Sequence, residues 1–142
     1  MIHFKLVTLN GIKFEDDVYE VILPTLDGQI GVLPGHMPLI SVATHGVIAI
    51  RRNQKDQDSS LEYFAANGGV VEVIDDNLKV IVDEADNADE INEKEAEKAF
   101  ELAKKMKQEA KDQVSLEHAQ SLIDRQVVRL QVAGLRRRKR QI

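Results

Sequence analysis

The chain has 142 residues, of which 43% are hydrophobic and 30% charged, and it contains no cysteine. This composition is typical of a folded domain and excludes a disulfide framework, a thiolate zinc site and a cysteine nucleophile. The formal net charge of -5 argues against a general nucleic-acid-binding protein, whose surface would be basic.

The first 85 residues predict a domain of short β-strands. All three prolines and seven of the eight glycines lie before residue 70 and separate short apolar or alternating runs. Because one flat sheet would leave an apolar face in water, these runs predict a sandwich or flattened barrel. The expected strands are HFKLVTL, DVYEVILPT, QIGVLP, PLISVAT, GVIAIR, LEYFAA, GVVEVID and NLKVIVD.

The stretch GQIGVLPGHMPLI, residues 28–40, holds three glycines, two prolines and a histidine. It lacks the GK[ST] ending of a phosphate-binding loop, and Pro38 prevents the helix that such a loop needs. Glycines allow tight turns here, and Pro34 and Pro38 stiffen the chain around His36. The stretch therefore predicts a rigid, partly apolar rim, which is either a docking edge or ordinary turn chemistry.

The polar segment RRNQKDQDSS, residues 51–60, is typical of a hairpin tip. Its Arg51–Arg52 pair is expected to be solvated.

Residues 70–133 contain no glycine and no proline, and the part of the chain after residue 85 is rich in helix-forming residues. Asn92 with Glu95 resembles a capping box, and Ser115 is the expected N-cap of a second helix. The two helices predict an antiparallel hairpin with a mostly alanine seam that buries little apolar area. Such a hairpin could detach. The residues expected to face the partner helix are Ala96, Ala99, Phe100, Ala103, Met106 and Ala110, then Leu116, Ala119, Ile123, Val127 and Leu130.

The composition break predicts two domains. The β-sandwich domain is assigned to residues 1–86 and the helical hairpin domain to residues 87–142.

The end of the chain is basic, because residues 125–142 carry seven basic side chains and no acidic one. From the residues alone, this can be helix-dipole complementarity with a solvated tail, or a surface for RNA, acidic lipid or acidic protein. The absence of an aromatic stacking residue nearby weakens the RNA interpretation.

No pattern predicts catalysis or a metal site. The four histidines, His3, His36, His45 and His118, have no metal-ligand spacing, and no GxSxG motif is present. Asp83, Glu84 and Asp86 lack the glycine and final glutamate of a calcium loop, so they are expected to be a solvated strand end.

Three segments carry a family resemblance: DGQIGVLPGHMPLI, HGVIAI and FAANGGVVEVIDDNLKVIVDEA. In order and spacing they resemble the epsilon subunit of bacterial-type F-type ATP synthases, and with the two helices the resemblance covers nearly the whole chain. It implies a ten-stranded β-sandwich followed by a C-terminal antiparallel two-helix hairpin, without catalytic activity.

The resemblance also implies partners. The sandwich would join the gamma subunit to the ring of membrane-embedded c subunits, in the rotating central stalk that couples proton-driven rotation to ATP synthesis. The ring-facing residues would be Gln29, Pro34, His36 and Met37. The membrane is contacted only indirectly, at the cytoplasmic face of a bacterial cell membrane, with a plastid thylakoid as the alternative.

The hairpin implied by the resemblance either folds on the sandwich or extends into the alpha/beta catalytic head and inhibits ATP hydrolysis. The residues expected to meet an acidic surface of the beta subunit are Arg125, Arg129, Arg136, Arg137 and Arg138.

Some family members bind ATP through an I-D-x-x-R-A motif on the first helix and arginines on the second. Here the motif is Ile91-Asn92-Glu93-Lys94-Glu95-Ala96. Arg125 and Arg129 match the second-helix arginines, but Asn92 replaces the acid and Glu95 replaces the arginine. We therefore expect weak or no ATP binding, and no cofactor.

Two other interpretations belong to different classes. A β-sandwich adaptor could bind RNA or anionic membrane through the basic C-terminus. A carbohydrate-binding sandwich has little support, because the chain has only two tyrosines, four phenylalanines and no tryptophan.

Overall fold

The computed structural model describes the backbone of residues 1–141 and the side chains of residues 1–138. Ten strands are followed by two helices, which confirms the expected sandwich and hairpin. The strands are β1 (Ile2–Thr8), β2 (Gly11–Val18), β3 (Glu20–Thr25), β4 (Gly28–Val32), β5 (Leu39–Ala43), β6 (Gly46–Arg51), β7 (Glu62–Ala66), β8 (Gly69–Ile74), β9 (Asn77–Val82) and β10 (Ala85–Asn87). The helices are α1 (Glu93–Glu109) and α2 (Gln113–Gln141), and two short 3-10 turns are η1 (Asp58–Ser60) and η2 (Ala88–Glu90).

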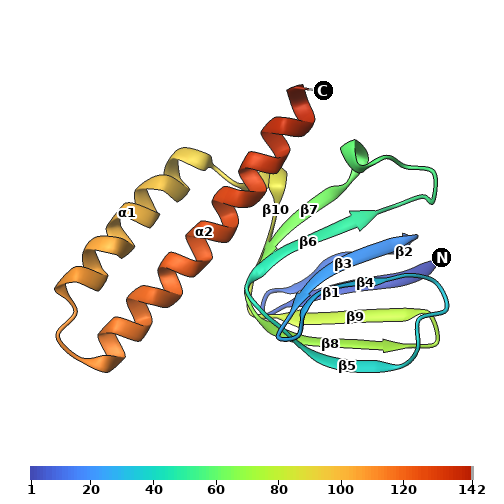
Figure 1. Ribbon diagram of the computed structural model, residues 1–142, viewed down its shortest axis with the longest axis horizontal. Helices are drawn as coiled ribbons and strands as arrows, with labels where there is room; N and C mark the ends of the chain where they lie inside the picture. The colour runs from blue at the N-terminus through green and yellow to red at the C-terminus, as the bar shows by residue number, and fades with distance from the viewer. Residues whose placement is uncertain (142) are drawn as a thin grey trace.

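The strands form one sheet that folds over its own apolar face (Figure 1). Its order is β10-β7-β6-β3-β5-β8-β9-β1-β2, and β4 pairs with β3 outside this path. β1 and β9 are parallel. Alternating side chains of these strands build one core, which excludes water from both layers. Its largest buried members are Phe4, Phe64, Ile2, Leu6, Leu23, Ile48, Ile50 and Leu78.

Gly69 allows β8 to lie close to β9. A Cβ atom at this position would stand 1.8 Å from the carbonyl oxygen of Ile81, a distance that no side chain can adopt. The glycine therefore fixes the start of the β8–β9 ladder, in which Val71 pairs with Val80 in the core.

The eight expected strands did not include β10, and they did not separate β2 from β3. The run DVYEVILPT covers the end of β2 and all of β3, and the chain turns between them at Tyr19. β2 lies at the end of the sheet order and buries only Val18. Because an edge strand with one buried side chain needs no apolar alternation, its charged sequence GIKFEDDV resembles a loop.

The prediction that Arg51 and Arg52 are solvated was wrong for Arg51, whereas the Arg52 side chain is 41% exposed but forms ion pairs. Arg51 Nε donates to Glu20 Oε1 at 3.1 Å, and its side chain is 16% exposed. Arg52 pairs with Glu62, and its Cζ lies 5.2 Å from the centroid of the Phe14 ring. Both arginines therefore close the connection between β6 and β7 onto neighbouring strands.

The hairpin begins as expected at Asn92, whose side chain accepts a hydrogen bond of 3.2 Å from the Glu95 amide. The expected start of α2 at Ser115 was wrong. The helix begins at Gln113, and Asp112 Oδ1 accepts a hydrogen bond of 2.7 Å from the Ser115 amide. Asp and Ser are both good caps, so the sequence alone could not separate these two positions.

Helix α2 packs on two sides, against α1 and against strands β6 and β7. This explains why the expected facing residues were partly wrong. Ala119 is buried as predicted, but Leu116 and Val127 are exposed, whereas Val128 and Val132 are buried. A helix with two partners does not show the single apolar stripe that a two-helix model assumes.

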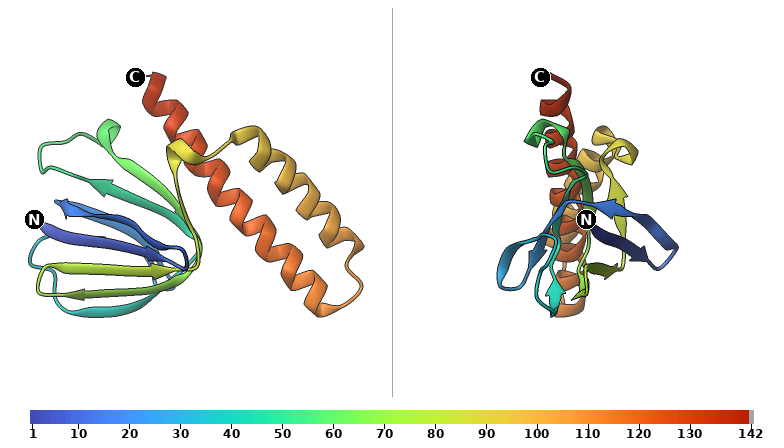
Figure 2. Two further views of the ribbon diagram at one scale, coloured as in Figure 1. Left: turned by 180° about the vertical axis from the view of Figure 1, so that it is seen from behind. Right: turned by 90° about the vertical axis from the view of Figure 1, so that its right-hand side faces the viewer.

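The hairpin lies at one end of the sandwich, and the N-terminus lies at the other (Figures 1 and 2). Strand β10 runs to Asn87, one residue beyond the predicted boundary. Independent folding of residues 1–86 stays a prediction. No helix in the described part of the chain is long and apolar enough to cross a membrane.

Candidate docking surfaces

The loop Leu33–Pro38 leaves β4 at the end of the sandwich opposite the hairpin (Figure 1). Its shape is fixed by Gly35, which has φ +83° and whose amide donates a hydrogen bond of 2.7 Å to Asp76 Oδ1. The His36 amide donates to the Leu33 carbonyl at 3.1 Å, and His36 Nδ1 lies 2.7 Å from the Met37 carbonyl. These hydrogen bonds hold the loop Leu33–Pro38 in one conformation.

The predicted rim residues do not form one patch. Pro34 and Met37 are exposed and His36 is half-buried, all within the loop Leu33–Pro38. Gln29 is also exposed, but it pairs with Pro24 at the far end of β4. With about 3.3 Å per strand residue, the length of β4 separates it from the other three.

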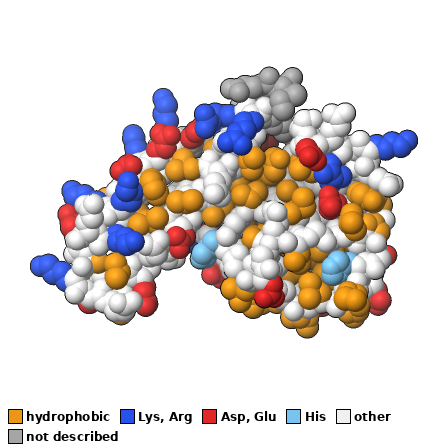
Figure 3. Space-filling model, in the orientation of Figure 1, with side chains coloured by type: hydrophobic (Ala, Val, Ile, Leu, Met, Phe, Trp, Pro, Cys, Tyr) orange, Lys and Arg blue, Asp and Glu red, His pale blue; other side chains and the backbone are white. Residues whose placement is uncertain are grey.

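An exposed apolar surface on β5, β8 and β9 was missed by the sequence prediction. We call this surface the outer face, and its residues are Ile40, Val42, Val70, Ile74 and Ile81, which are 46–77% exposed. Figure 3 shows hydrophobic side chains gathered on the lower part of the sandwich, where these strands lie. The runs PLISVAT, GVVEVID and NLKVIVD carry apolar residues on both faces of a strand, and this pattern is the sequence signal for an apolar outer face.

Strand register joins three residues of the outer face in one row. Val42 pairs with Val70, and Val70 pairs with Ile81. In the next row on this face, Ile40 pairs with Glu72 and Glu72 pairs with Lys79, so a charged pair lies between the apolar row and Ile74. Such a surface is typical of a protein-binding site, because contiguous exposed apolar area is uncommon on monomeric proteins.

The apolar contact between hairpin and sandwich is small. It joins Val128, Val132 and Ala133 of α2 to a few residues of the sandwich and the following turn. Those residues are Ala65, Ala88 and Ile91, with Val47 and Tyr63 at the margin. Half of the fully buried members are alanine, so this seam contributes little apolar burial per residue.

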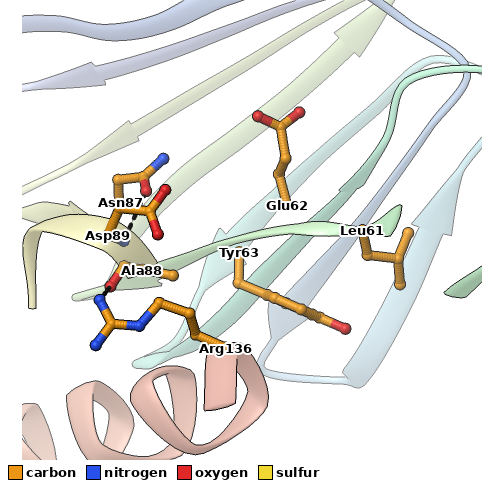
Figure 4. Close-up of a pocket in the computed structure, with 7 residues that line it drawn as sticks. All are labelled: Leu61, Glu62, Tyr63, Asn87, Ala88, Asp89 and Arg136. Atoms are coloured by element: carbon orange, nitrogen blue, oxygen red, sulfur yellow. Dashed lines mark hydrogen bonds between the residues drawn. The ribbon is translucent and has the colours of Figure 1, made fainter. Parts of the chain in front are cut away.

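Four arginines of α2 add polar contacts along this seam. Arg125 Nε lies 3.2 Å from Glu84 Oε2, and Arg129 Nε lies 3.6 Å from Asp86 Oδ2. Further along, Arg137 Nη2 lies 3.0 Å from Glu93 Oε1. Arg136 Nη1 donates a hydrogen bond of 2.6 Å to the Ala88 carbonyl (Figure 4).

We call these contacts between α2 and residues 84–93 the arginine ladder. Hydrogen bonding along it is incomplete, because the Nε atoms of Arg129 and Arg136 are buried without a hydrogen-bond partner among the described residues. Arg138 is exposed, and the side chains of the remaining basic residues, Lys139 and Arg140, lie outside the described part.

A cavity of about 300 Å³ lies beside Arg136. Figure 4 shows Tyr63 on one side of it and Asn87 and Asp89 on the other. Burial raises the pKa of the Tyr63 phenol. The charged lining residues are Glu62, Asp89 and Arg136. Glu62 pairs with Arg52, and Arg136 donates to the Ala88 carbonyl, so both already have partners within the chain.

The residues at the ATP-motif positions have structural partners of their own. Asn92 caps α1, and Glu95 is exposed on its first turn. Arg125 and Arg129 face Glu84 and Asp86. The positive charge that would attract a triphosphate is therefore already matched by carboxylates of the chain.

Comparison with known proteins gives consistent findings. Residues 1–88 match the family model described as ATP synthase, Delta/Epsilon chain, beta-sandwich domain. The ATP synthase epsilon chain of Chloroflexus aggregans is 34% identical over 139 residues, which cover 98% of this chain and 96% of the relative. The epsilon chain of Halalkalibacterium halodurans is 32% identical, covering 94% of this chain and 97% of the relative.

Solved structures show the same fold. A chain of the Euglena gracilis mitochondrial ATP synthase, described as OSCP/F1/c-ring, aligns with a TM-score of 0.78 at 20% identity. The alignment covers 94% of this chain and 81% of the other. A chain of the Tetrahymena thermophila mitochondrial enzyme, described as central stalk/c-ring, aligns with a TM-score of 0.61 at 19% identity, covering 94% and 96%.

Proposed function

The chain belongs to the epsilon-chain family of ATP synthases, and on that premise we propose that it joins gamma to the c ring and restrains ATP hydrolysis through its hairpin. An epsilon chain is a non-catalytic subunit of a membrane-associated complex. The proposal therefore concerns contacts and their regulation. We place this chain at the cytoplasmic face of a bacterial cell membrane.

The ring contact is assigned to the loop Leu33–Pro38. The loop is exposed at Pro34 and Met37 and is held in shape by the bond from Gly35 to Asp76. This loop lies at the end of the sandwich farthest from the hairpin. Because its conformation is already fixed, it loses little conformational entropy when it binds a partner. Gln29 lies at the other end of β4 and is not part of this loop.

The gamma contact is assigned to the outer face, which is the single observation that carries the proposal. The hairpin packs on β6 and β7 and leaves β5, β8 and β9 uncovered. Ile40 and Val70 are 77% and 47% exposed. Burying these apolar side chains against a partner removes them from water, which stabilises the complex. Glu72 and Lys79 would fix the orientation of that partner.

The inhibitory role is assigned to the hairpin in an extended position. Its seam with the sandwich combines a small apolar contact with partly exposed ion pairs. Partly exposed pairs contribute about 0.2–1 kcal/mol each, so the folded position is only moderately stable. The released arginines, with Arg138, would then meet an acidic surface of the catalytic head.

Nucleotide does not control the hairpin in this proposal. Glu95 would repel a triphosphate, and Arg125 and Arg129 are matched by acids. Addition of ATP should leave the thermal midpoint of the isolated chain unchanged. A clear rise in that midpoint would contradict this part.

Binding to gamma tests the outer face. Val70→Asp places a charge at its centre and should abolish co-elution with gamma in size-exclusion chromatography, while the chain stays folded. The matched control is Leu26→Asp, because Leu26 is 69% exposed on the turn between β3 and β4. If Val70→Asp binds gamma as the control does, the outer face is not the contact.

A further inference from the structure

We propose that Glu84 and Asp86 form an internal acidic decoy that holds Arg125 and Arg129 in the folded hairpin and thereby sets how readily the hairpin opens. This inference rests on the proposed inhibitory function. Arg125 and Arg129 are expected to bind the catalytic head when the hairpin is extended. In the folded hairpin, the same two arginines bind the sandwich and keep the hairpin away from the head. The strength of inhibition is then a competition between two sets of acids for one set of arginines.

The spacing of the four residues fits this role. Glu84 immediately precedes β10 and Asp86 lies within it, on either side of the buried Ala85, and the carboxylates of both residues face α2. Two strand residues span about 6.6 Å. Arg125 and Arg129 are four residues apart on α2, which is one helical turn and about 6 Å. The two repeats match, so both ion pairs form at once.

The rest of the arginine ladder has a different character. Arg136 binds backbone carbonyls, and Arg137 pairs with Glu93 at the start of the hairpin itself. Those contacts depend on residues 88–93, which lie beyond the last strand. Among the described side chains of α2, only Arg125 and Arg129 pair with carboxylates at the end of the sandwich. These two pairs therefore link the position of α2 to the sandwich by charge.

The decoy separates two effects that an arginine substitution would mix. Changing Arg125 or Arg129 weakens the folded hairpin and also removes its grip on an acidic partner. Neutralising Glu84 and Asp86 weakens only the folded hairpin and leaves the arginines intact. Glu84→Gln with Asp86→Asn should therefore increase extension and lower ATP hydrolysis.

A distance measurement on the full chain tests the decoy. Because the chain has no cysteine, Asp27→Cys on the β3–β4 turn and Lys111→Cys at the hairpin tip accept fluorescent labels specifically. Energy transfer between them reports the folded fraction. The matched control is Asp83→Asn with Glu97→Gln, which loses the same two charges at exposed positions with no ion pair among the described residues.

We expect Glu84→Gln/Asp86→Asn to shift the ratio of folded to open hairpin by about two- to thirty-fold, the range expected for two partly exposed pairs. The control should shift it little. Added salt should open the wild-type hairpin and have a smaller effect on the variant. Circular dichroism checks that both variants keep their helices, so a shift cannot come from unfolding.

Two results separate the decoy from the proposed function. If the acid variant and the control show the same energy transfer and salt response, the decoy is wrong. If the acid variant opens the hairpin but ATP hydrolysis by the reconstituted enzyme does not fall, the decoy stands and the inhibitory function fails.

Discussion

Gly35 and Asp76 are 41 residues apart in the chain, yet the Gly35 amide donates a hydrogen bond of 2.7 Å to the Asp76 carboxylate. The Asp76 carbonyl in turn accepts a hydrogen bond of 2.9 Å from the His3 amide. One residue of the β8–β9 turn therefore ties the loop Leu33–Pro38 to the start of β1. This arrangement connects three segments at the proposed ring-facing end of the sandwich.

Asp76→Gly should loosen this loop. Glycine keeps the positive φ of the position, 61°, and removes only the carboxylate, at a cost of about 0.5–1.5 kcal/mol. Amide hydrogen exchange of the loop should become faster, and coupling should weaken. The control is Asp75→Gly, because Asp75 also has positive φ, 48°, and does not bind Gly35. Equal exchange rates in both variants would contradict the anchoring role.

His36→Asp should weaken coupling between proton flow and ATP synthesis. The change places a negative charge beside the Met37 carbonyl, which His36 now contacts at 2.7 Å, and alters the surface offered to the ring. Proton pumping per ATP hydrolysed in membrane vesicles measures the effect. His118→Asp makes the same chemical change at an exposed position on α2 and should be neutral. Unchanged pumping by both would make the loop an ordinary turn.

Truncation after Asp86 should leave a folded sandwich. The main core cluster lies within residues 2–85, so all of its buried side chains are retained. The fragment should melt cooperatively and still bind gamma through the outer face. Loss of Ala88 and Ile91 affects only the seam with the hairpin. An unfolded fragment would show that the hairpin is needed for the fold. A folded fragment that does not co-elute with gamma would show that the sandwich alone is not sufficient for this contact.

The edge of the sheet should become less stable as pH rises. His3 lies between Glu15 and Asp17, with both ring nitrogens 2.8 Å from carboxylate oxygens. Hydrogen bonds to Glu15 and then Asp17 raise the pKa of His3 above its usual 6.5. The contribution of His3 to the free energy of unfolding is therefore complete below pH 6.5, its usual pKa. This contribution is lost as the pH rises through the raised pKa of the folded state. Glu15→Gln with Asp17→Asn should flatten this dependence in denaturant unfolding.

The sequence predicted the sandwich and the hairpin because turn residues and helix formers separate cleanly along the chain. It did not predict β2, whose edge position lets Glu15, Asp16 and Asp17 replace an apolar pattern. It also missed the outer face, because an apolar strand side can point inward or toward a partner with the same residues.

The candidate sites divide in the same way. The motif around His36 was visible as a rigid loop, whereas its anchor at Asp76 lies far away in sequence. The basic end of α2 was visible as charge, but the acids that pair with it could not be found. Asp83, Glu84 and Asp86 look alike in sequence, and only the position of α2 selects Glu84 and Asp86.

The central claim is that the hairpin restrains ATP hydrolysis, and the hydrolysis rate of the reconstituted enzyme tests it most directly. Three forms of the chain are compared: wild type, Arg125→Glu with Arg129→Glu, and the truncation after Asp86. Clustered charge pairs in a partly buried interface contribute a few kcal/mol, so the truncation should raise the rate. The Arg125→Glu/Arg129→Glu variant should also raise the hydrolysis rate, because its glutamates cannot pair with an acidic surface of the head. If all three rates coincide, the hairpin is not an inhibitor in this protein.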